Sequence, residues 1–349
     1  MSQVSIKDVA RIAGVSIATV SRCINEPGRV KSGTRDRVQQ AIKATGYAPN
    51  ALAQNFRRGK TQVIMVVLPS VGDPFYTDVM KGIRGVAGTA GYSLLINETR
   101  LNTLSADQVG AMVVSRQADG IVLLASLSPY GTRVFSEGNE NALPVVVACE
   151  TVSDDLLGFP GVHIDNVAAA QEATHYLLRL GHRKIAFIHG QQGSMLTRDR
   201  EGGYLAAMKQ AGVEVEPGWL LEGGLSIEGA SRATARLLEH RHRPTAIFCA
   251  NDEMALGCMH TLKSAGLRVP GDISVVGFDD IRYAAVTDPP LTTVAQPAEE
   301  IGKRVMHRLL REIEGDHSAG PAVEIAPHRL VIRASAGPPP ELQTYRDCR

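Results

Sequence analysis

The stretch S-I-K-D-V-A-R-I-A-G-V-S-I-A-T-V-S-R, residues 5–22, decides how this chain begins to fold. Ser5 is followed three residues later by Asp8, a spacing typical of the capping box that starts a helix, and apolar residues then recur at helical intervals. Gly14 can take the left-handed conformation that ends a helix, and Ser16 can cap a second helix directly after it. The pattern therefore predicts two short helices joined by a tight turn.

The second of these helices has a face that its own packing does not require. Val20 points to the inward side, whereas the opposite side carries Ile17, Ala18, Ser21 and Arg22. A short helix that presents such a face after a tight turn is typical of helix-turn-helix proteins. We therefore expect this face to enter a groove of double-stranded DNA.

The next segments extend this beginning into a small head and a linker. Ser32 can cap a third helix that Gly46 ends, which completes an all-α head over residues 1–48. Residues 51–58, A-L-A-Q-N-F-R-R, are good helix formers but allow only about two turns, which is marginal in water. We therefore expect this hinge helix, within a linker of residues 49–61, to be ordered only against DNA or a partner copy.

The net charge of +1 conceals an asymmetry between the head and the rest of the chain. Residues 1–60 carry eleven basic and three acidic residues, a net charge of +8. The remainder carries 26 basic and 33 acidic residues, a net charge of −7. A small basic head on a mildly acidic body indicates that the head alone binds a polyanion.

From Val63 onward, buried apolar runs alternate with amphipathic helices. Repeated strand–helix units of this length predict parallel sheets with right-handed crossovers, and roughly ten strands are too many for one lobe. We predict an α/β body of two doubly wound lobes at residues 62–335, divided near residue 161, and a flexible tail at residues 336–349. Ligands of such folds bind at the carboxyl ends of strands, so the cleft between the lobes is the expected ligand site.

The cysteines and the apolar runs bear on cofactors and location. The five cysteines form no CxxC pair and no spacing typical of metal ligands, so we expect reduced packing residues, no metal and no cofactor. No apolar signal core precedes the head, and no run approaches the roughly 18 apolar residues of a membrane span. We therefore expect a cytoplasmic protein without a membrane partner.

Six motifs together resemble the lactose-repressor family of bacterial transcription regulators, over almost the whole chain. Within that family, the cytidine and purine repressors look most similar. The motifs are residues 5–22, Gly46-Tyr47-x-Pro49-Asn50, Asp73-Pro74-Phe75, and residues 162–166, 277–280 and 288–293.

The resemblance implies a homodimer on a pseudo-palindromic operator, with a hinge helix in the minor groove. It also implies a periplasmic-binding-protein-like body that binds a small effector, a nucleoside or a sugar. Finally, it implies later crossings of the chain between the lobes near residues 291 and 325.

Ile17, Ala18 and Arg22 match the family positions that read base edges in the major groove. Arg22 can bond guanine bidentately, whereas Ile17 and Ala18 offer only apolar contact, for instance with a thymine methyl group. The alternative for Arg22 is a phosphate contact. A set of short polar and aromatic residues is expected to contact the DNA backbone instead: Ser16, Thr19, Ser21, Asn25, Thr34, Tyr47 and Asn50.

Phe56 stands where the family usually has a leucine that wedges between base pairs at the operator centre. A phenylalanine can also intercalate, at an unstacking cost of a few kcal/mol. We expect Phe56, with Ala53, to contact the minor groove. The alternative is that Phe56 packs on its own hinge helix or on the partner's.

The resemblance also implies effector-binding residues. Arg200, Asn251 and Asp279 match family positions that bond effector hydroxyls or ring nitrogens, although a structural ion pair between Arg200 and Asp279 is the alternative. Leu225 stands where the purine repressor stacks an aromatic ring, which counts against a purine effector. The remaining candidates are Asp73, Phe75, Tyr76, Ser126, Glu150 and Ser194.

Two other classes of protein fit parts of the sequence. A solute-binding protein of an uptake system would fit the body, but it predicts an export signal and no basic head. An enzyme acting on nucleosides or sugars would need a convergent nucleophile, base or metal cluster. His163 and Asp165 lie on one predicted strand with no identifiable nucleophile, so we predict no catalytic residue.

Overall fold

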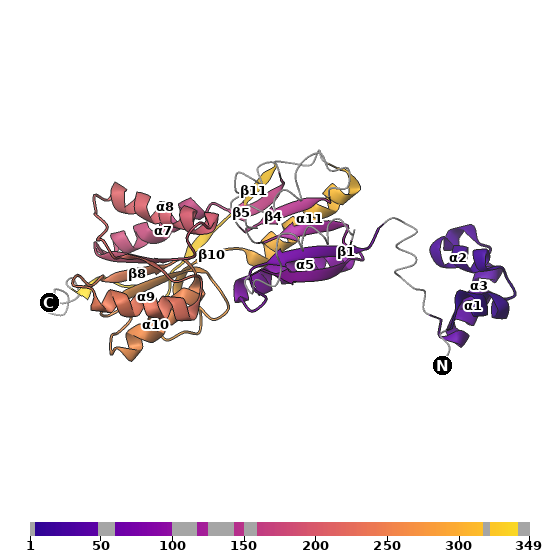
Figure 1. The fold of residues 1–349 in the computed structure, drawn as a ribbon, viewed down its shortest axis with the longest axis horizontal. Helices are drawn as coiled ribbons and strands as arrows, with labels where there is room; N and C mark the ends of the chain where they lie inside the picture. Colours follow the sequence, from indigo (N-terminus) through magenta and orange to yellow (C-terminus); the bar gives the residue numbers. More distant parts are fainter. Residues whose placement is uncertain are drawn as a thin grey trace. The chain divides into compact units, whose positions relative to one another are not determined.

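The computed structural model describes residues 4–47, 60–99, 117–124, 143–149, 159–316 and 322–340. The chain divides into two compact units, residues 1–61 and residues 62–349, and each is described by itself. The first unit is helical, and the second contains two six-stranded sheets whose strands are parallel except for one (Figure 1). None of the helices in the described ranges is long and apolar enough to span a membrane.

The head consists of α1, α2, a 3₁₀ turn and α3, and its first turn is built as the sequence predicts. The Ser5 amide donates to the Asp8 carboxylate at 3.0 Å, which together with the Ser5 hydroxyl lowers the pKa of Asp8. Gly14 has φ +62° and ends α1. The helices span Ile6–Ala13, Ile17–Asn25, Pro27–Arg29 and Ser32–Thr45. Their small core contains Val9, Ala10, Ala13, Val20, Cys23, Val38 and Ala41.

The first lobe of the body is a six-stranded parallel sheet in the order β11-β5-β4-β3-β1-β2. Its central strands are continuous apolar runs, as expected where both faces of a sheet are covered. The strands are β1 (Val63–Leu68), β2 (Ser93–Glu98), β3 (Gly120–Leu123), β4 (Val145–Ala148), β5 (Gly161–Ile164) and β11 (Val323–Ala326). Helices α5 (Pro74–Thr89) and α11 (Ala298–Glu314) pack together over this sheet. A Cβ atom at Gly82 would overlap the Glu299 carbonyl oxygen, so the absence of a side chain permits this close helix contact.

The second lobe has a six-stranded sheet in the order β12-β10-β9-β8-β6-β7, parallel except that β12 runs against β10. Helices α7 and α8 cover one face, and α9 and α10 cover the other (Figure 1). The strands are β6 (Ile185–His189), β7 (Leu220–Glu222), β8 (Ala246–Cys249), β9 (Ser274–Asp279), β10 (Thr292–Ala295) and β12 (Arg329–Val331). The helices are α7 (Asn166–Arg179), α8 (Met195–Gln210), α9 (Ile227–Glu239) and α10 (Asp252–Ser264).

Three crossings connect the lobes, each a few residues beyond the expected position. Strand β5 still pairs with β4 and β11, so the chain leaves the first lobe after Ile164. Strand β10 still pairs with β9, so the chain returns at Gln296 and Pro297. The third crossing lies between β11 and β12, at residues 327–328. The positions of the crossings are therefore set by where the hydrogen bonds between strands end, and not by changes in sequence composition.

The prediction of a flexible tail at residues 336–349 is wrong for residues 336–340. The Gly337 amide donates to the Ser274 hydroxyl at 3.1 Å, and its carbonyl oxygen lies 2.8 Å from His182 Nε2. Pro339 is buried. Proline lacks an amide for a sheet ladder, but a proline-containing segment can still pack and bond through its neighbours. The rest of the predicted tail lies outside the described residues.

Candidate functional site

The exposed side of α2 forms an open concavity of about 460 Å³ on the head. It brings together all three predicted base-reading residues and two predicted backbone contacts. The predicted residues that line it are Ile17, Ala18, Ser21, Arg22 and Asn25. Residues on one helical face at i, i+1, i+4, i+5 and i+8 thus form one continuous surface.

This concavity is apolar where α2 begins and carries the guanidinium of Arg22 farther along the helix, followed by Asn25 and Glu26. Ile17 is 44% exposed, although the rest of the helix buries Val20 and Cys23 in the head core. Ala18 and Arg22 are also exposed. An apolar side chain beside a guanidinium is suited to a thymine methyl group next to a guanine edge.

The predicted backbone contacts already have local roles in the head. The Ser16 hydroxyl accepts a hydrogen bond from the Thr19 amide at 3.1 Å and caps α2. The side-chain Nδ2 of Asn25 donates to the Ser21 carbonyl oxygen at 2.8 Å. Thr34 lies in the first turn of α3, and Tyr47 packs partly buried against the head core. Three further predicted residues lie outside the described residues: Asn50, Ala53 and Phe56.

A second candidate site is a small cavity between the two lobes of the body. It brings together six of the nine predicted effector residues, Asp73, Phe75, Tyr76, Arg200, Asn251 and Asp279, with Cys149, Leu196 and Leu225. Its volume is about 20 Å³, which is room for about one water molecule. Ser126 and Glu150 lie outside the described residues.

Three of the predicted polar residues sit at helix starts, where their side chains act as caps. Asp73 accepts from the Phe75 amide at 2.9 Å, and Asn251 accepts from the Met254 amide at 2.9 Å. These bonds start α5 and α10 at the cavity, so the positive ends of two helix dipoles lie there. Ser194 caps α8 but is absent from the cavity lining.

Arg200 is the most enclosed charged group of the cavity, with 2% of its surface exposed. Its guanidinium lies 3.6 Å over the ring of Phe278, donates through Nε to Asn166 Oδ1 at 3.0 Å, and also donates to the Ala250 carbonyl oxygen. Nη2 lies 3.6 Å from Asp279 Oδ1. Burial of a cation is costly unless it is paired and hydrogen-bonded, and these four contacts meet that requirement.

Asp279 is 8% exposed and accepts a hydrogen bond from Gln296 Nε2 at 2.7 Å. Burial raises the pKa of Asp279 to about 7; the Arg200 charge opposes this shift, and the Asp73 charge adds to it. A carboxyl group with such a pKa can either donate or accept a hydrogen bond near neutral pH.

Strained backbone is concentrated around the same cavity. Three residues that line it have positive φ without being glycine: Cys149 at +71°, Leu225 at +53° and Asp279 at +111°. Asp280, the next residue, has φ +56°. Such conformations cost about 1–3 kcal/mol each and occur preferentially at ligand sites and switch regions.

The sequence interpretation missed several residues of this site. Cys149 and Leu196 line the cavity, and Asn166 and Gln296 hold its charged pair. One signal was available, because Asn166 and Gln296 each follow a buried strand within two residues. Such positions lie at the edge of a parallel sheet where ligands bind.

His163 and Asp165, for which we predicted no catalytic role, each bond to a neighbouring backbone group and not to one another. His163 Nδ1 lies 2.8 Å from the Ile164 carbonyl oxygen, whereas the Asp165 carboxylate accepts from the Ala168 amide and caps α7. In the part of the chain that the structure describes, no group of three or more His, Cys, Asp or Glu side chains could hold a metal ion.

Comparisons with known proteins agree with this arrangement of a head and a two-lobed body. A family model described as "Bacterial regulatory proteins, lacI family" matches residues 5–50, and one described as "Periplasmic binding protein-like domain" matches residues 174–336. The HTH-type transcriptional repressor CytR of Escherichia coli K12 is 38% identical over 331 residues, 95% of this chain and 96% of that protein. The HTH-type transcriptional repressor PurR of Erwinia tasmaniensis is 33% identical over 99% of both chains.

A solved structure shares both the head and the body. The lac repressor dimer bound to operator and the anti-inducer ONPF has a TM-score of 0.85 at 27% identity, with 96% of this chain and all of that chain covered. The relatives include two HTH-type transcriptional repressors and the HTH-type transcriptional regulator DegA of Bacillus subtilis. This chain therefore belongs to the lacI family of bacterial regulatory proteins and is a DNA-binding transcriptional repressor.

Proposed function

We propose that this repressor acts as a homodimer on a pseudo-palindromic operator and that a nucleoside or a sugar, bound between the lobes of its body, controls it. The observation that carries the proposal is the cavity at which a buried Arg200, a buried Asp279 and two helix starts converge from both lobes. A ligand that contacts both lobes favours one arrangement of them over another, which is the requirement for control.

Sequence readout is assigned to the concavity on α2. Arg22 would bond a guanine edge, while Ile17 and Ala18 would contact thymine methyl groups. Because two of the three residues cannot donate hydrogen bonds from their side chains, each half-site depends strongly on Arg22. Contacts to the DNA backbone are assigned to Ser16, Thr19, Ser21, Asn25, Thr34, Tyr47 and Asn50.

The hinge residues Ala53 and Phe56 are assigned to the minor groove at the operator centre. A phenylalanine wedge kinks the duplex, so base steps that unstack easily would be preferred there. With few direct hydrogen bonds from the heads, this deformation would supply part of the specificity.

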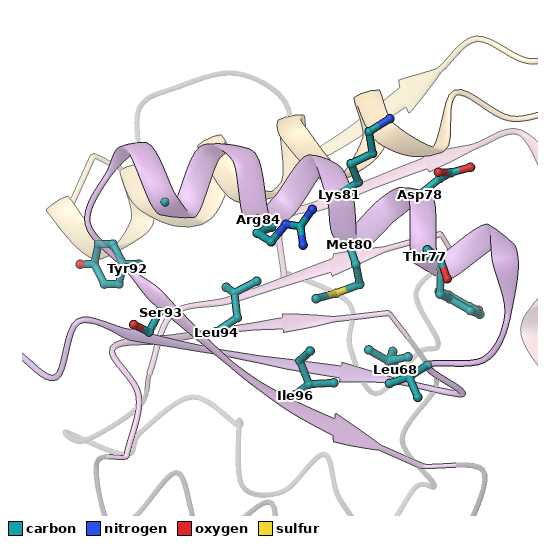
Figure 2. A pocket seen from close by; sticks show the side chains of 13 residues that line it. Leu68, Thr77, Asp78, Met80, Lys81, Arg84, Tyr92, Ser93, Leu94 and Ile96 are labelled. Atoms are coloured by element: carbon teal, nitrogen blue, oxygen red, sulfur yellow. The ribbon is translucent and has the colours of Figure 1, made fainter.

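A groove between α5 and the edge strand β2 supports the homodimer. Figure 2 shows Met80 of α5 pointing toward Leu94 and Ile96 of β2, and the groove measures about 580 Å³. Ile96 is 46% exposed, and Val71, which also lines the groove, is 55% exposed. Exposed apolar surface of this kind on an edge strand requires a partner or a cover.

The charges around this groove suit a second copy of the same chain. Asp78 and Arg84 lie on its rim with opposite charge. A two-fold axis through the groove can therefore place Asp78 of one copy opposite Arg84 of the other. The second lobe exposes Tyr283 and Val286, at 41% and 78%, which would extend a dimer interface along the body.

The cavity chemistry supports a ligand rich in hydroxyl groups. Arg200 and the Asn251 amide can donate to ring or hydroxyl oxygens, and Asp279 can accept from hydroxyl groups. Phe75 and Tyr76, whose rings lie 5.2 Å apart edge to face, can pack on a sugar or base. Nucleosides and sugars combine these features.

The lobes must separate to admit such a ligand. Ligand pockets usually measure about 300–1,000 Å³, whereas this cavity holds about one water molecule. The structure therefore corresponds to the closed arrangement in this proposal, and the effector would select a more open one.

Operator binding is tested by titrating the full chain with the duplex upstream of its own gene at several salt concentrations. A basic head that neutralises phosphates should lose affinity steeply as salt rises. A flat salt dependence would contradict the assigned backbone contacts.

Effector class and oligomeric state need separate measurements. A thermal-shift screen of the full chain against cytidine, uridine, adenosine and D-ribose should raise the melting temperature with at least one compound. No shift with any of the four would reject this effector class. Sedimentation should give a dimer that Ile96→Asp dissociates, and a monomeric unmodified protein would reject the assigned interface.

A further inference from the structure

The Arg200–Asp279 pair is held from behind by two amide side chains, Asn166 and Gln296. Asn166 Oδ1 accepts from Arg200 Nε at 3.0 Å, and Gln296 Nε2 donates to Asp279 Oδ1 at 2.7 Å. Both amides are buried, at 2% and 7% exposure. The four side chains therefore form one chain of polar contacts, from Asn166 through Arg200 and Asp279 to Gln296.

The ends of this chain of contacts lie on two of the three crossings between the lobes. Asn166 begins α7 directly after the chain leaves the first lobe, and Gln296 is the residue at which the chain turns back to it. The middle of the chain, Arg200 and Asp279, faces the cavity. Any change in how these two side chains are held therefore changes the bonds available to both crossings.

Each amide uses one of its two polar atoms on this pair and leaves the other without a partner. Four buried side-chain polar atoms lack a hydrogen bond within the described ranges, and two of them are Asn166 Nδ2 and Gln296 Oε1. A buried polar atom without a hydrogen-bond partner is unfavourable, because it has lost its bonds to water. Both atoms are therefore available to form new hydrogen bonds when Arg200 and Asp279 move.

We propose that Asn166 and Gln296 are positioning residues that couple the state of Arg200 and Asp279 in the cavity to the two crossings they occupy. This rests on the proposed function, because it assigns the regulation of the same cavity. When an effector engages Arg200 and Asp279, the two amides change partners, and the crossings turn with them. The two amides do not line the cavity.

The first test uses the ligand-free full chain, so that it is independent of the effector. Asn166→Leu removes the acceptor for Arg200 Nε at similar volume, whereas Asn166→Asp keeps an acceptor oxygen beside the guanidinium. Gln210→Met, at the exposed end of α8, is the matched control. Amide hydrogen exchange is measured at residues 294–300, on the other crossing.

Asn166→Leu should accelerate exchange at residues 294–300 by about fivefold or more, because it loosens the Arg200–Asp279 pair that holds Gln296. Asn166→Asp and Gln210→Met should leave this exchange unchanged. An effect of Asn166→Leu confined to residues 163–170 would overturn the proposal. An equal acceleration in Asn166→Asp or in Gln210→Met would also overturn it.

A second comparison separates the chain of contacts from direct packing between the crossings. In an Arg200→Met background, adding Asn166→Leu should cause no further acceleration at residues 294–300. A further acceleration as large as in the unmodified protein would overturn the proposal. If Asn166→Leu does not fold, Gln296→Met serves as the reciprocal variant, with exchange measured at residues 163–170 and the same opposing outcomes.

The link to regulation is tested with operator DNA and the three probes cytidine, adenosine and D-ribose. A probe that changes the operator Kd of the unmodified protein, by a factor typically of about 5–150, should change that of Asn166→Leu by a factor close to 1. An equal response in both proteins would overturn the coupling. No response to any probe in the unmodified protein would reject the proposed effector class, while the exchange experiment still decides the coupling.

Discussion

The concavity on the head and the cavity in the body are built in opposite ways. Within residues 4–47, no polar or charged side chain is buried, and the surface of α2 exposes an isoleucine at 44%. The body cavity encloses an arginine at 2% exposure and an aspartate at 8%, with strained backbone around them. The head site exposes its side chains to solvent. The body site buries charged side chains, and neighbouring polar atoms there lack hydrogen-bond partners.

This difference separates the two tasks of a regulator. A DNA-binding surface needs side chains in a fixed geometry that requires little strain, and the capped turns at Ser5, Gly14 and Ser16 provide it. A switch needs two arrangements of similar free energy, which strain and unpaired polar atoms help to produce. Substitutions on the exposed face of α2 should therefore change DNA affinity at constant stability, whereas substitutions in the cavity should change stability itself.

The largest expected effect is that of Arg200→Met on the free energy of unfolding. Loss of the guanidinium leaves Asp279 buried without its counter-charge, and such changes cost about 3–5 kcal/mol. Urea denaturation at pH 8 measures the loss. Arg198→Met, at a side chain that is 66% exposed, is the control and should change stability by less than about 0.5 kcal/mol. Equal free energies of unfolding for Arg200→Met and Arg198→Met would contradict the claim that substitutions in the body cavity, unlike those on an exposed surface, change stability.

Asp279→Asn should alter the pH dependence of stability. The pKa of Asp279 is raised from 3.8 to about 7 in the folded state, so the folded protein keeps a proton that the unfolded chain releases. This contribution to stability is complete below pH 4, is lost as pH rises to about 7, and is absent above that. Relative to Asp279→Asn, the unmodified protein should therefore lose stability across this window, by at most about 1.4 kcal/mol per pH unit.

Burial and, to a smaller extent, the charge of Asp279 also raise the pKa of Asp252, so a change in the Asp252 titration contributes to the difference between the two proteins. Urea denaturation of both proteins from pH 4.5 to 8.5 gives the comparison. A constant difference in stability over this range would mean that Asp279 is ionised throughout in the folded state.

Arg22→Ala should cost about 1–3 kcal/mol of operator binding free energy and relax the preference at one base pair in each half-site. The free energy of unfolding should stay within about 0.5 kcal/mol of the unmodified protein, because Arg22 is exposed. Anisotropy titrations against single-base-pair variants of the operator measure both effects. An equal loss of affinity for every sequence would assign Arg22 to a phosphate.

Much of the fold could be predicted because it depends on local patterns. The capping box at Ser5, the left-handed Gly14 and the apolar run of β1 are all determined by neighbouring residues. The crossings could not be located as well, because the sheet that a strand end such as Ile164 joins depends on distant pairing. Short, half-buried strands such as β7 and β12 give almost no periodic signal.

The candidate site was predicted unevenly for a similar reason. Arg200, Asn251 and Asp279 were predicted from the family resemblance, whereas Asn166 and Gln296 resemble ordinary residues at strand ends. Their role depends on contacts 34 and 17 residues away along the chain, which composition does not encode. The packing of Gly337 against His182 is likewise a long-range contact, and it explains why the proline-rich segment is ordered where a frayed tail was predicted.

The most direct test of the account is whether the body cavity and the head are thermodynamically linked. The operator Kd is measured with and without saturating cytidine, adenosine or D-ribose, and the Kd of the same compound is measured with and without operator. If the cavity controls the head, one compound should change the operator Kd by about 5–150-fold, and operator should change the Kd of that compound by the same factor. Binding of a compound in the cavity that leaves the operator Kd unchanged would contradict the account.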